Sequence, residues 1–403
     1  MTSISLNKQI GSVLVVVGTE IGAGVLALPI IIAQIGLLAG SIVMFISWLL
    51  MTYTALLVCE TTLASVDGVS FAGIGRNLLN PFGQMVIWGS FLFLLYAIIV
   101  AYISGAVSAF STELKINSHI ISILFVFVLG TCVVLGTSVV DWVNRLLLGA
   151  KLIALISVGF VLLSHIKPAN LTYSFFTMRS FIGSIPVFIT AFTSHLIIPP
   201  LRTYLKSDTK ILVRTVLIGS IIPLILYIIW IIGVMGIIPH TGINSFYSLF
   251  NQSRNPNVGD VLNLMNFNIH SSFIYLPVSI FSNISVTTSF LGVSLALFYF
   301  LIDAFKLHRL SKFKKNLAAS ILTFVLPLIV VWHAPDIFIK ALGYVGLCCS
   351  ILLIIIPFFM MQNLNKKNHS FKIKFINHPF LLWLSLILGV VVVVIQLSIS
   401  YIK

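Results

Sequence analysis

Glu20 is the residue of this chain with the clearest capacity for chemistry. It lies in the middle of a long apolar run, inside the segment Gly18-Thr19-Glu20-Ile21-Gly22-Ala23-Gly24, which is followed by Pro29. An ionised carboxylate is costly in apolar surroundings, so such a residue is expected to carry a proton or to bind a cationic group. The alternative is a permanently protonated Glu20 that donates a hydrogen bond to a neighbouring helix.

Three glycines close to Glu20 predict that the helix breaks there. Glycine costs about 1 kcal/mol in a helix interior relative to alanine, and Gly18, Gly22 and Gly24 fall within one short segment. Unwound backbone in an apolar layer is tolerated only where protein or water satisfies its polar groups, so a break of this kind lines a cavity. The half-helix after the break would point its partial positive charge at a bound anion such as a carboxylate. Close helix packing through small residues is the alternative.

A second polar cluster lies in the apolar run 181–200. It consists of Thr190, Thr193, Ser194 and His195, and His195 is the only histidine well inside a predicted membrane span. We expect the cluster to line a cavity. The alternative is that the hydroxyls bond back to their own helix and that His195 only packs.

A third polar cluster, in the run 271–302, consists of Ser285, Thr287, Thr288 and Ser289. Clustered hydroxyls that face unwound carbonyls offer the hard oxygen ligands that a sodium ion would use. Thr288 and Ser289 are therefore a candidate ion site, although ordinary helix packing explains the same residues.

The elements that must position these residues are apolar helices. Of the 403 residues, 59% are hydrophobic and only 8% are charged, which is too little charge for a water-soluble surface. The composition predicts an all-α integral membrane protein that forms a single transmembrane domain over residues 1–403. The net charge of +14 is spread in short clusters between apolar runs. We therefore expect a lipid bilayer as its surroundings and no nucleic acid partner.

Motifs for enzyme chemistry are absent from the sequence. It contains neither the Gly-x-x-x-x-Gly-Lys-Ser/Thr pattern for ATP nor the His-Glu-x-x-His pattern for zinc. The four cysteines, Cys59, Cys132, Cys348 and Cys349, lack metal-ligand spacing. We expect no enzyme activity, no cofactor, no metal and no obligatory protein partner.

At about 20 apolar residues per crossing, the chain offers eleven candidate spans. They lie at about 9–35, 37–60, 84–110, 119–137, 146–164, 181–200, 212–237, 271–302, 317–333, 338–361 and 379–401. Two polar segments between them, 67–83 and 238–270, are either gating elements or inert connections. The second is expected to be an external loop with room for a short helix.

The distribution of lysine and arginine predicts the orientation, because these residues are enriched on the inner side of a membrane. With the N-terminus inside, 17 of the 23 lie inside and six lie outside. The inner residues are Lys8, Arg76, Arg145, Lys151, Arg202, Lys206, Lys210, Arg214, Lys306, Arg309, Lys312, Lys314, Lys315, Lys366, Lys367, Lys372 and Lys374. The outer residues are Lys115, Lys167, Arg179, Arg254, Lys340 and Lys403.

Several segments resemble the hydroxy/aromatic amino acid permeases, the bacterial tyrosine and tryptophan transporters. The first span matches from Gly18 to Pro29, and the eighth matches most strongly, from Thr287 to Leu295. Further matches are His195, Ile198-Pro199, Tyr204-Leu205, Gly219-Ser220, Pro223, Tyr227, Trp230, Phe298, Leu301 and Asp303. They span most of the chain and occur in the family's order.

The resemblance implies an eleven-helix secondary transporter of the amino acid–polyamine–organocation superfamily with the leucine-transporter type of fold. Two inverted five-helix repeats, at about 9–164 and 181–361, would be followed by an extra helix at about 379–401. The family generally imports aromatic amino acids by proton symport across the bacterial inner membrane. The N-terminus would be cytoplasmic and the C-terminus periplasmic.

The resemblance also implies a substrate site. The stretch from Gly18 to Gly24 would hold the amino and carboxylate groups of the substrate, and Phe192 to His195 would face its side chain. The implied substrate-binding residues are Gly18, Thr19, Glu20, Gly22, Ala23, Gly24, Phe192, Thr193, Ser194 and His195.

Two positions depart from the family pattern. Family members usually carry a small or hydroxyl residue at the position of Glu20 and a glycine at that of Thr193. Glu20 can therefore serve proton coupling or bind a substrate ammonium, and Thr193 narrows the pocket. The resemblance thus implies import of tyrosine, tryptophan or phenylalanine by proton symport with alternating access. One alternative is a permease for another neutral amino acid such as serine, for which sodium bound at Thr288 and Ser289 could be the coupling ion. The other is a channel or a non-transporting sensor.

Overall fold

In the computed structural model, all regular elements among the described residues are helices, as predicted for an all-α protein. The structure describes residues 4–22, 24–114, 116–163, 165–172, 175–251, 255–269 and 272–401. The α-helices are α1 (Leu6–Glu20), α2 (Gly24–Ile35), α3 (Leu37–Leu63), α4 (Phe71–Leu78), α5 (Pro81–Leu114), α6 (Ser118–Leu135), α7 (Thr137–Leu163), α8 (Met178–Thr190), α9 (Ile198–Tyr204), α10 (Thr209–Ile237), α11 (Phe246–Phe250), α12 (Val258–Ile269), α13 (Ser272–Ala304), α14 (Lys312–His333), α15 (Phe338–Cys349), α16 (Ile356–Lys366) and α17 (Pro379–Tyr401). Short 3-10 helices are η1 (Pro168–Leu171), η2 (His195–Ile197), η3 (Leu307–Arg309) and η5 (Lys374–Asn377), and η4 (Ser350–Ile355) is a π-helix.

Apolar helices of membrane length make up most of the chain. Among the described residues, nine helical segments are long and apolar enough to cross a membrane, and the bent pair α1 and α2 raises the number to ten. These ten correspond to ten of the predicted spans, and α7 occupies the remaining one at 146–164. The protein is therefore an integral, multi-pass membrane protein, and a count of eleven crossings stays a prediction.

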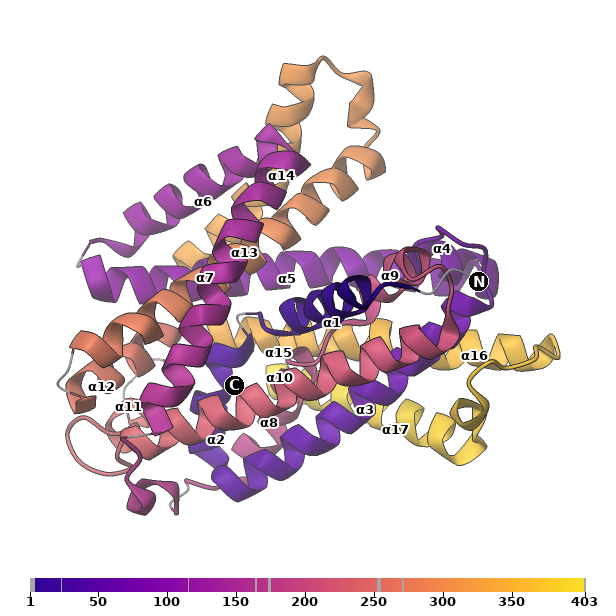
Figure 1. The fold of residues 1–403 in the computed structure, drawn as a ribbon. Coiled ribbons are helices and arrows are strands. Elements are labelled where there is room, and N and C mark those ends of the chain that lie inside the picture. The colour runs from indigo at the N-terminus through magenta and orange to yellow at the C-terminus, as the bar shows by residue number, and fades with distance from the viewer. Residues whose placement is uncertain are drawn as a thin grey trace.

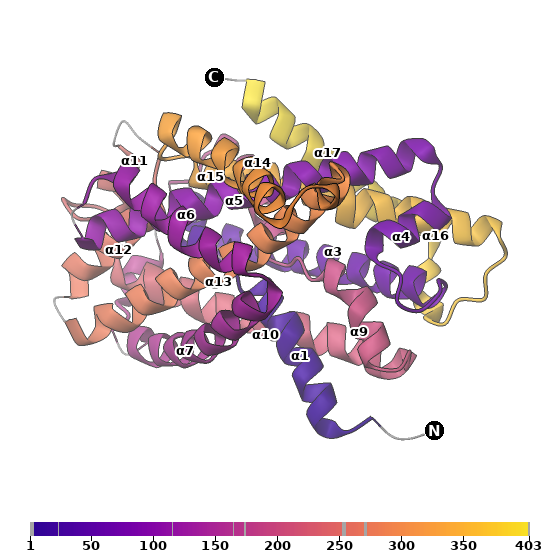
Figure 2. The ribbon, with the colours of Figure 1, turned by 90° about the horizontal axis from the view of Figure 1, so that it is seen from above.

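The bundle of helices has two distinct ends. The N-terminus, α4 and α9 lie at one end, together with the turn after α16 (residues 367–378, which include η5). α11 and α12 lie at the opposite end (Figure 1). The view from above in Figure 2 shows the same separation. The polar segments predicted at 67–83 and 238–270 contain α4 and the pair α11 and α12, so they lie at opposite ends of the bundle.

The first apolar run is broken where its glycines predict a break. α1 ends at Glu20, α2 begins at Gly24, and the two helices are bent by 53° at this point. Pro29 adds a defect within α2, because proline has no N–H to donate to the carbonyl four residues earlier, that of Val25. The indole Nε1 of Trp230 in α10 donates to this carbonyl instead, at 3.1 Å.

The run predicted at 181–200 is also interrupted. α8 ends at Thr190, residues 191–194 are not helical, and η2 and α9 follow. The hydroxyl of Thr190 donates to the carbonyl of Val187 (2.7 Å), and that of Thr193 donates to the carbonyl of Thr190 (3.3 Å). Hydroxyls that bond to nearby carbonyls in this way compete with the helical ladder.

Glycines allow close backbone contact around both interrupted runs. A Cβ at Gly219 in α10 would lie 2.5 Å from Val16 in α1. A Cβ at Gly346 in α15 would lie only 2.0 Å from the carbonyl oxygen of Pro186 in α8. Since that atom belongs to the backbone, α8 cannot yield to a larger side chain without moving as a whole.

The glycine contact between α15 and α8 predicts a stability effect. Gly346→Ala should lower the free energy of unfolding by about 1–3 kcal/mol, because the added methyl overpacks a backbone contact. Gly89→Ala in α5 is the matched control, since a Cβ there meets nothing within 4 Å and alanine favours the helix. Thermal unfolding in detergent compares the two variants, and equal midpoints would contradict the contact.

Candidate functional site

The two interrupted runs meet at a buried carboxylate. Glu20 is the last residue of α1 and is only 4% exposed. The hydroxyl of Ser194, from the non-helical residues after α8, donates to its Oε1 at 2.7 Å. Its Oε2 is buried and has no hydrogen-bond partner within the described part of the chain. The structure thus leaves one carboxyl oxygen of Glu20 available to a proton or a ligand.

Tyr227 of α10 joins the backbones of both breaks. Its hydroxyl lies 2.7 Å from the carbonyl oxygen of Glu20 and 3.1 Å from that of Ala191, which follows α8 directly. The side chain is fully buried, and its ring packs against that of Phe192 with 5.5 Å between centroids. One side chain therefore holds two unwound segments that are far apart in the sequence.

Lys151 reaches the first break from α7. Its ammonium donates to the carbonyl oxygen of Ile21, and the residue is only 2% exposed. The prediction that Lys151 lies on the inner side of the membrane was wrong. α7 begins at Thr137, so Lys151 lies in the middle of this helix. Arg145 and Asp141 form an exposed ion pair at 2.9 Å in the early turns of α7. The position of Lys151, as a lone lysine well inside an apolar run, was the signal that could have identified it as a buried residue of the site.

His195 connects the second break to α3. The hydroxyl of Thr54 donates to the carbonyl of Met51 (3.1 Å), so we assign the donor role in the 2.9 Å contact between His195 and Thr54 to Nε2 of the ring. Nδ1 then remains an acceptor, and it has no partner among the residues that the structure describes. Ser194 and His195 therefore bind two different neighbours, α1 and α3.

Gly22 lies between the first break and two further helices. A Cβ at Gly22 would lie 3.3 Å from the hydroxyl of Tyr102 in α5 and 3.4 Å from that of Ser289 in α13. A Cβ at Gly24 would lie 3.6 Å from the hydroxyl of Thr190. The glycines thus keep three hydroxyl groups close to the unwound backbone.

The remaining predicted site residues divide into two groups. Phe192 is buried beside Tyr227, and Gly18 and Thr193 are half-buried near the breaks. Thr19, in contrast, is exposed, and its hydroxyl donates back to the carbonyl of Val15 at 2.8 Å. Ala23 lies outside the described residues.

The predicted ion site is only partly assembled around the break. Ser289 lies beside Gly22, as described above, but Thr288 donates its hydroxyl to the carbonyl of Ile284 in its own helix at 2.9 Å. The buried hydroxyl of Ser285 has no partner in the described ranges. Of the third cluster, Ser289 is the residue whose hydroxyl lies close to the unwound backbone, beside Gly22.

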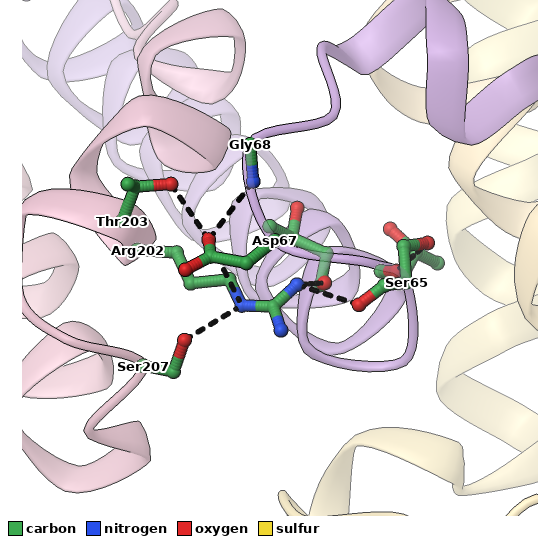
Figure 3. A network of polar contacts seen from close by, with 8 residues as sticks. Ser65, Asp67, Gly68, Arg202, Thr203 and Ser207 are labelled. Carbon is green, nitrogen blue, oxygen red and sulfur yellow. Dashed lines mark hydrogen bonds and ion pairs between the residues drawn. The ribbon is translucent and has the colours of Figure 1, made fainter.

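A second polar network ties the end of α9 to the end of α3 (Figure 3). Arg202 of α9 donates to the carbonyls of Thr62 and Ser65, and its Nε lies 3.1 Å from the hydroxyl of Ser207. Thr203 donates to Asp67 at 2.6 Å, and this hydrogen bond lowers the pKa of the Asp67 carboxyl below its ordinary value. The segment after the second break is thus fastened to α3 at His195 and again at Arg202.

The fold and the site define the class of protein. It is a multi-pass membrane transporter whose polar centre lies where two interrupted helices meet. The chain matches the tryptophan/tyrosine permease family over residues 5–396. It therefore belongs to this family, whose members are transporters and not enzymes, and the resemblance found in the sequence is confirmed.

Individual relatives cover nearly the whole chain. The chain is 32% identical to tyrosine-specific transport system 2 of Haemophilus influenzae, over 98% of this chain and 97% of the relative. It is 30% identical to glutamine transporter 2 of Aliivibrio fischeri, over 89% and 90%. It is 28% identical to a tryptophan-specific transport protein of Shigella flexneri, over 94% and 92%. The family implies an amino acid substrate, and the names of these relatives include more than one.

The position of the Tyr227 hydroxyl predicts a specific loss of transport. Tyr227→Phe removes the hydroxyl that links the backbones of the two breaks. It should therefore lower amino acid uptake about ten-fold or more at equal membrane abundance, a change of about 1.4 kcal/mol. Tyr96→Phe is the matched control, since it removes a 2.7 Å hydrogen bond to the carbonyl of Leu322 away from the breaks. Both variants should lose about 1 kcal/mol of stability. Equal uptake by the two would show that the Tyr227 contact is only structural.

Proposed function

We propose that this protein is a secondary active transporter that imports the aromatic amino acids tyrosine, tryptophan and phenylalanine by alternating access around its two helix breaks. The observation that carries the proposal is the 2.7 Å hydrogen bond from Ser194 to Glu20, which joins a buried carboxylate at one break to the other break. An ionisable group inside a membrane is costly and is usually functional. The tyrosine- and tryptophan-specific relatives support the substrate class.

The substrate is proposed to bind between the breaks. The backbone from Gly18 to Gly24, including Thr19 and Ala23, would hold its amino and carboxylate groups, with Gly22 and Gly24 leaving room for them. Phe192, Thr193, Ser194 and His195 would face its side chain. The buried Phe192 ring beside Tyr227 supports an aromatic substrate, because aromatic rings pair favourably.

Glu20 is the proposed proton carrier. Protonation of Oε2, which has no partner in the described part of the chain, would neutralise the carboxylate for passage through the apolar layer. The contact from Lys151 to the carbonyl of Ile21 supports a proton over sodium. Unwound carbonyls are the groups that a sodium ion would need at such a break, and here the fixed ammonium of Lys151 binds one of them.

The proposed architecture has eleven crossings, with one repeat at about 9–164, a second at about 181–361 and an extra helix at about 379–401. Its support is that the breaks fall in the first and sixth predicted spans. The proposed orientation places the N-terminus in the cytoplasm and the C-terminus in the periplasm of a bacterial inner membrane. Basic elements such as α4, α9 and the turn after α16 lie at the same end as the N-terminus, which supports this orientation.

The direct test is uptake by purified protein in liposomes. Labelled tyrosine is offered with and without an imposed pH gradient, and unlabelled amino acids serve as competitors. Saturable uptake that requires the gradient and is blocked by tryptophan or phenylalanine supports the proposal. Conduction without saturation would indicate a channel, and binding without uptake would indicate a sensor.

The proposed role of Glu20 predicts a separation of two activities. Glu20→Gln should abolish accumulation driven by the pH gradient and leave at least part of the exchange of labelled for unlabelled tyrosine, because the amide keeps the shape but carries no proton. Asp141→Asn is the matched control, since Asp141 is an exposed carboxylate in an ion pair with Arg145. Accumulation by the Gln variant at the level of the Asn variant would remove Glu20 from the coupling step.

A polar neutral amino acid is the second candidate substrate, with sodium as the alternative ion. The unpartnered Oε2 of Glu20 could accept a hydrogen bond from a substrate amide, and one relative is named a glutamine transporter. Serine belongs to the same class. Thr288 and Ser289 would then serve the ion.

Ion replacement separates the two candidates. For the aromatic, proton-coupled transporter, exchanging sodium for choline at constant pH should leave tyrosine uptake unchanged within about two-fold, and excess glutamine or serine should not compete. Sodium-stimulated uptake that is lost in Ser289→Ala, together with competition by glutamine, would establish the second candidate instead.

A further inference from the structure

A basic groove lies on the surface between the start of α10 and the turn that follows α16. Its volume is about 530 Å³. Lys210 and Arg214 line it from α10, and Lys372 and Lys374 line it from the turn. All four side chains are exposed, and no ion pair or hydrogen bond of their charged groups is found among the described residues. The groove therefore presents four positive charges.

The acids near the groove are engaged elsewhere. Asp208 caps α10, where its Oδ1 accepts from the backbone N–H of Ile211 at 3.0 Å. Glu60 of α3 is fully buried behind the turn, and its two oxygens accept from the backbone N–H groups of Lys372 and Ile373, each at 2.9 Å. His369 adds a 3.4 Å contact to Glu60. The carboxylate of Glu60 thus binds the backbone of the turn, not its lysine side chains.

The turn is held in a defined conformation. Ile373 and Ile376 are buried, and Lys372, Lys374 and Phe375 are exposed. The hydroxyl of Tyr53 donates to the carbonyl of Ile376 at 2.9 Å. The side-chain amides of Asn365 and Asn377 donate to each other at 2.8 and 2.7 Å. The two lysines are therefore presented by fixed backbone and not by a flexible tail.

An apolar track leads away from the basic groove along α10. Leu217 and Ile218 line the groove itself. Ile221, Ile225 and Ile228 continue the track and are 39%, 51% and 38% exposed. Residues three and four apart share one face of a helix, so this row is continuous. The basic groove lies where the apolar part of α10 begins, which is where lipid headgroups meet hydrocarbon.

We infer that this groove is a binding site for an anionic phospholipid. The phosphate of the headgroup would lie among Lys210, Arg214, Lys372 and Lys374, and an acyl chain would lie along the isoleucine row of α10. Basic pockets between transmembrane helices recognise anionic headgroups in this way, because each nearby cation adds attraction to the phosphate. The lipid would bridge α10, which holds Tyr227, and the turn anchored on α3.

A second hollow provides the comparison. It has the same volume, about 530 Å³, and lies at the start of α14 next to α6. Lys312 is the only basic residue lining it. Size and an apolar wall are therefore common to both hollows, and the density of positive charge distinguishes the proposed site.

The test is a titration of the full-length protein in detergent with dioleoylphosphatidylglycerol or dioleoylphosphatidylcholine, followed by native mass spectrometry. The wild type should bind the anionic lipid about ten-fold more tightly than the zwitterionic one. Lys372→Gln/Lys374→Gln and Lys210→Gln/Arg214→Gln should each lose most of this preference. Lys312→Gln/Lys314→Gln, which removes two charges at the start of α14, should keep it within about two-fold.

The outcomes that overturn the inference are distinct. Equal affinity for the two lipids would show that the four positive charges do not select the lipid. A loss of preference in the α14 variant equal to that in the groove variants would show unspecific attraction to a basic surface. Binding of inorganic phosphate as tight as that of the lipid would assign the site to a free anion. Salt provides a measurement that needs no variant, because raising it should weaken binding of the anionic lipid alone. None of these results depends on the transported substrate.

Discussion

The backbone carbonyls that the first helix break sets free have to find donors, because an apolar layer supplies none. Tyr227 lies within hydrogen-bond distance of the carbonyl of Glu20, and Lys151 donates to that of Ile21. Trp230 donates to the carbonyl of Val25, which Pro29 leaves without a helical donor within α2. These donors come from only two helices, α7 and α10. The break persists because α7 and α10 are packed against it. The close approach of Gly219 in α10 to Val16 in α1 brings α10 near enough for its side chains to reach the carbonyls.

The same hydrogen bonds make the two breaks one mechanical unit. Tyr227 connects their backbones, and Ser194 connects the second break to the carboxylate of Glu20. A proton on the other carboxyl oxygen would convert an acceptor into a donor, so the charge state of Glu20 is felt by groups on both interrupted runs. In the proposed function, these are the contacts that would couple proton binding at Glu20 to substrate binding between the breaks.

α3 serves as the common anchor at the end of the bundle that contains the N-terminus. Arg202 of α9 donates to the carbonyl of Thr62 in the last turn of α3 and to that of Ser65 just after it, and the buried Glu60 accepts from the backbone of the turn after α16. His195 adds a contact to Thr54 closer to the breaks. Because these attachments involve backbone groups and buried side chains, α3, α9 and this turn are expected to move together. The basic groove next to α10 would allow surrounding lipid to act on that unit.

Local chemistry made much of the protein predictable. Composition determined the membrane class, apolar length located the helices, and the glycines near Glu20 located the first break, since each depends on neighbouring residues in the chain. Tertiary structure decided the partners. It placed Lys151 at the carbonyl of Ile21, selected Ser194 over Thr190 and Thr193 as the donor to Glu20, turned the Thr19 hydroxyl back to Val15, and gave Tyr227 both breaks to bind. The reason is geometric. The direction of a side chain depends on how its helix is rotated in the bundle, and its partner depends on which helix packs beside it. The local spacing of residues determines neither the rotation nor the neighbouring helix.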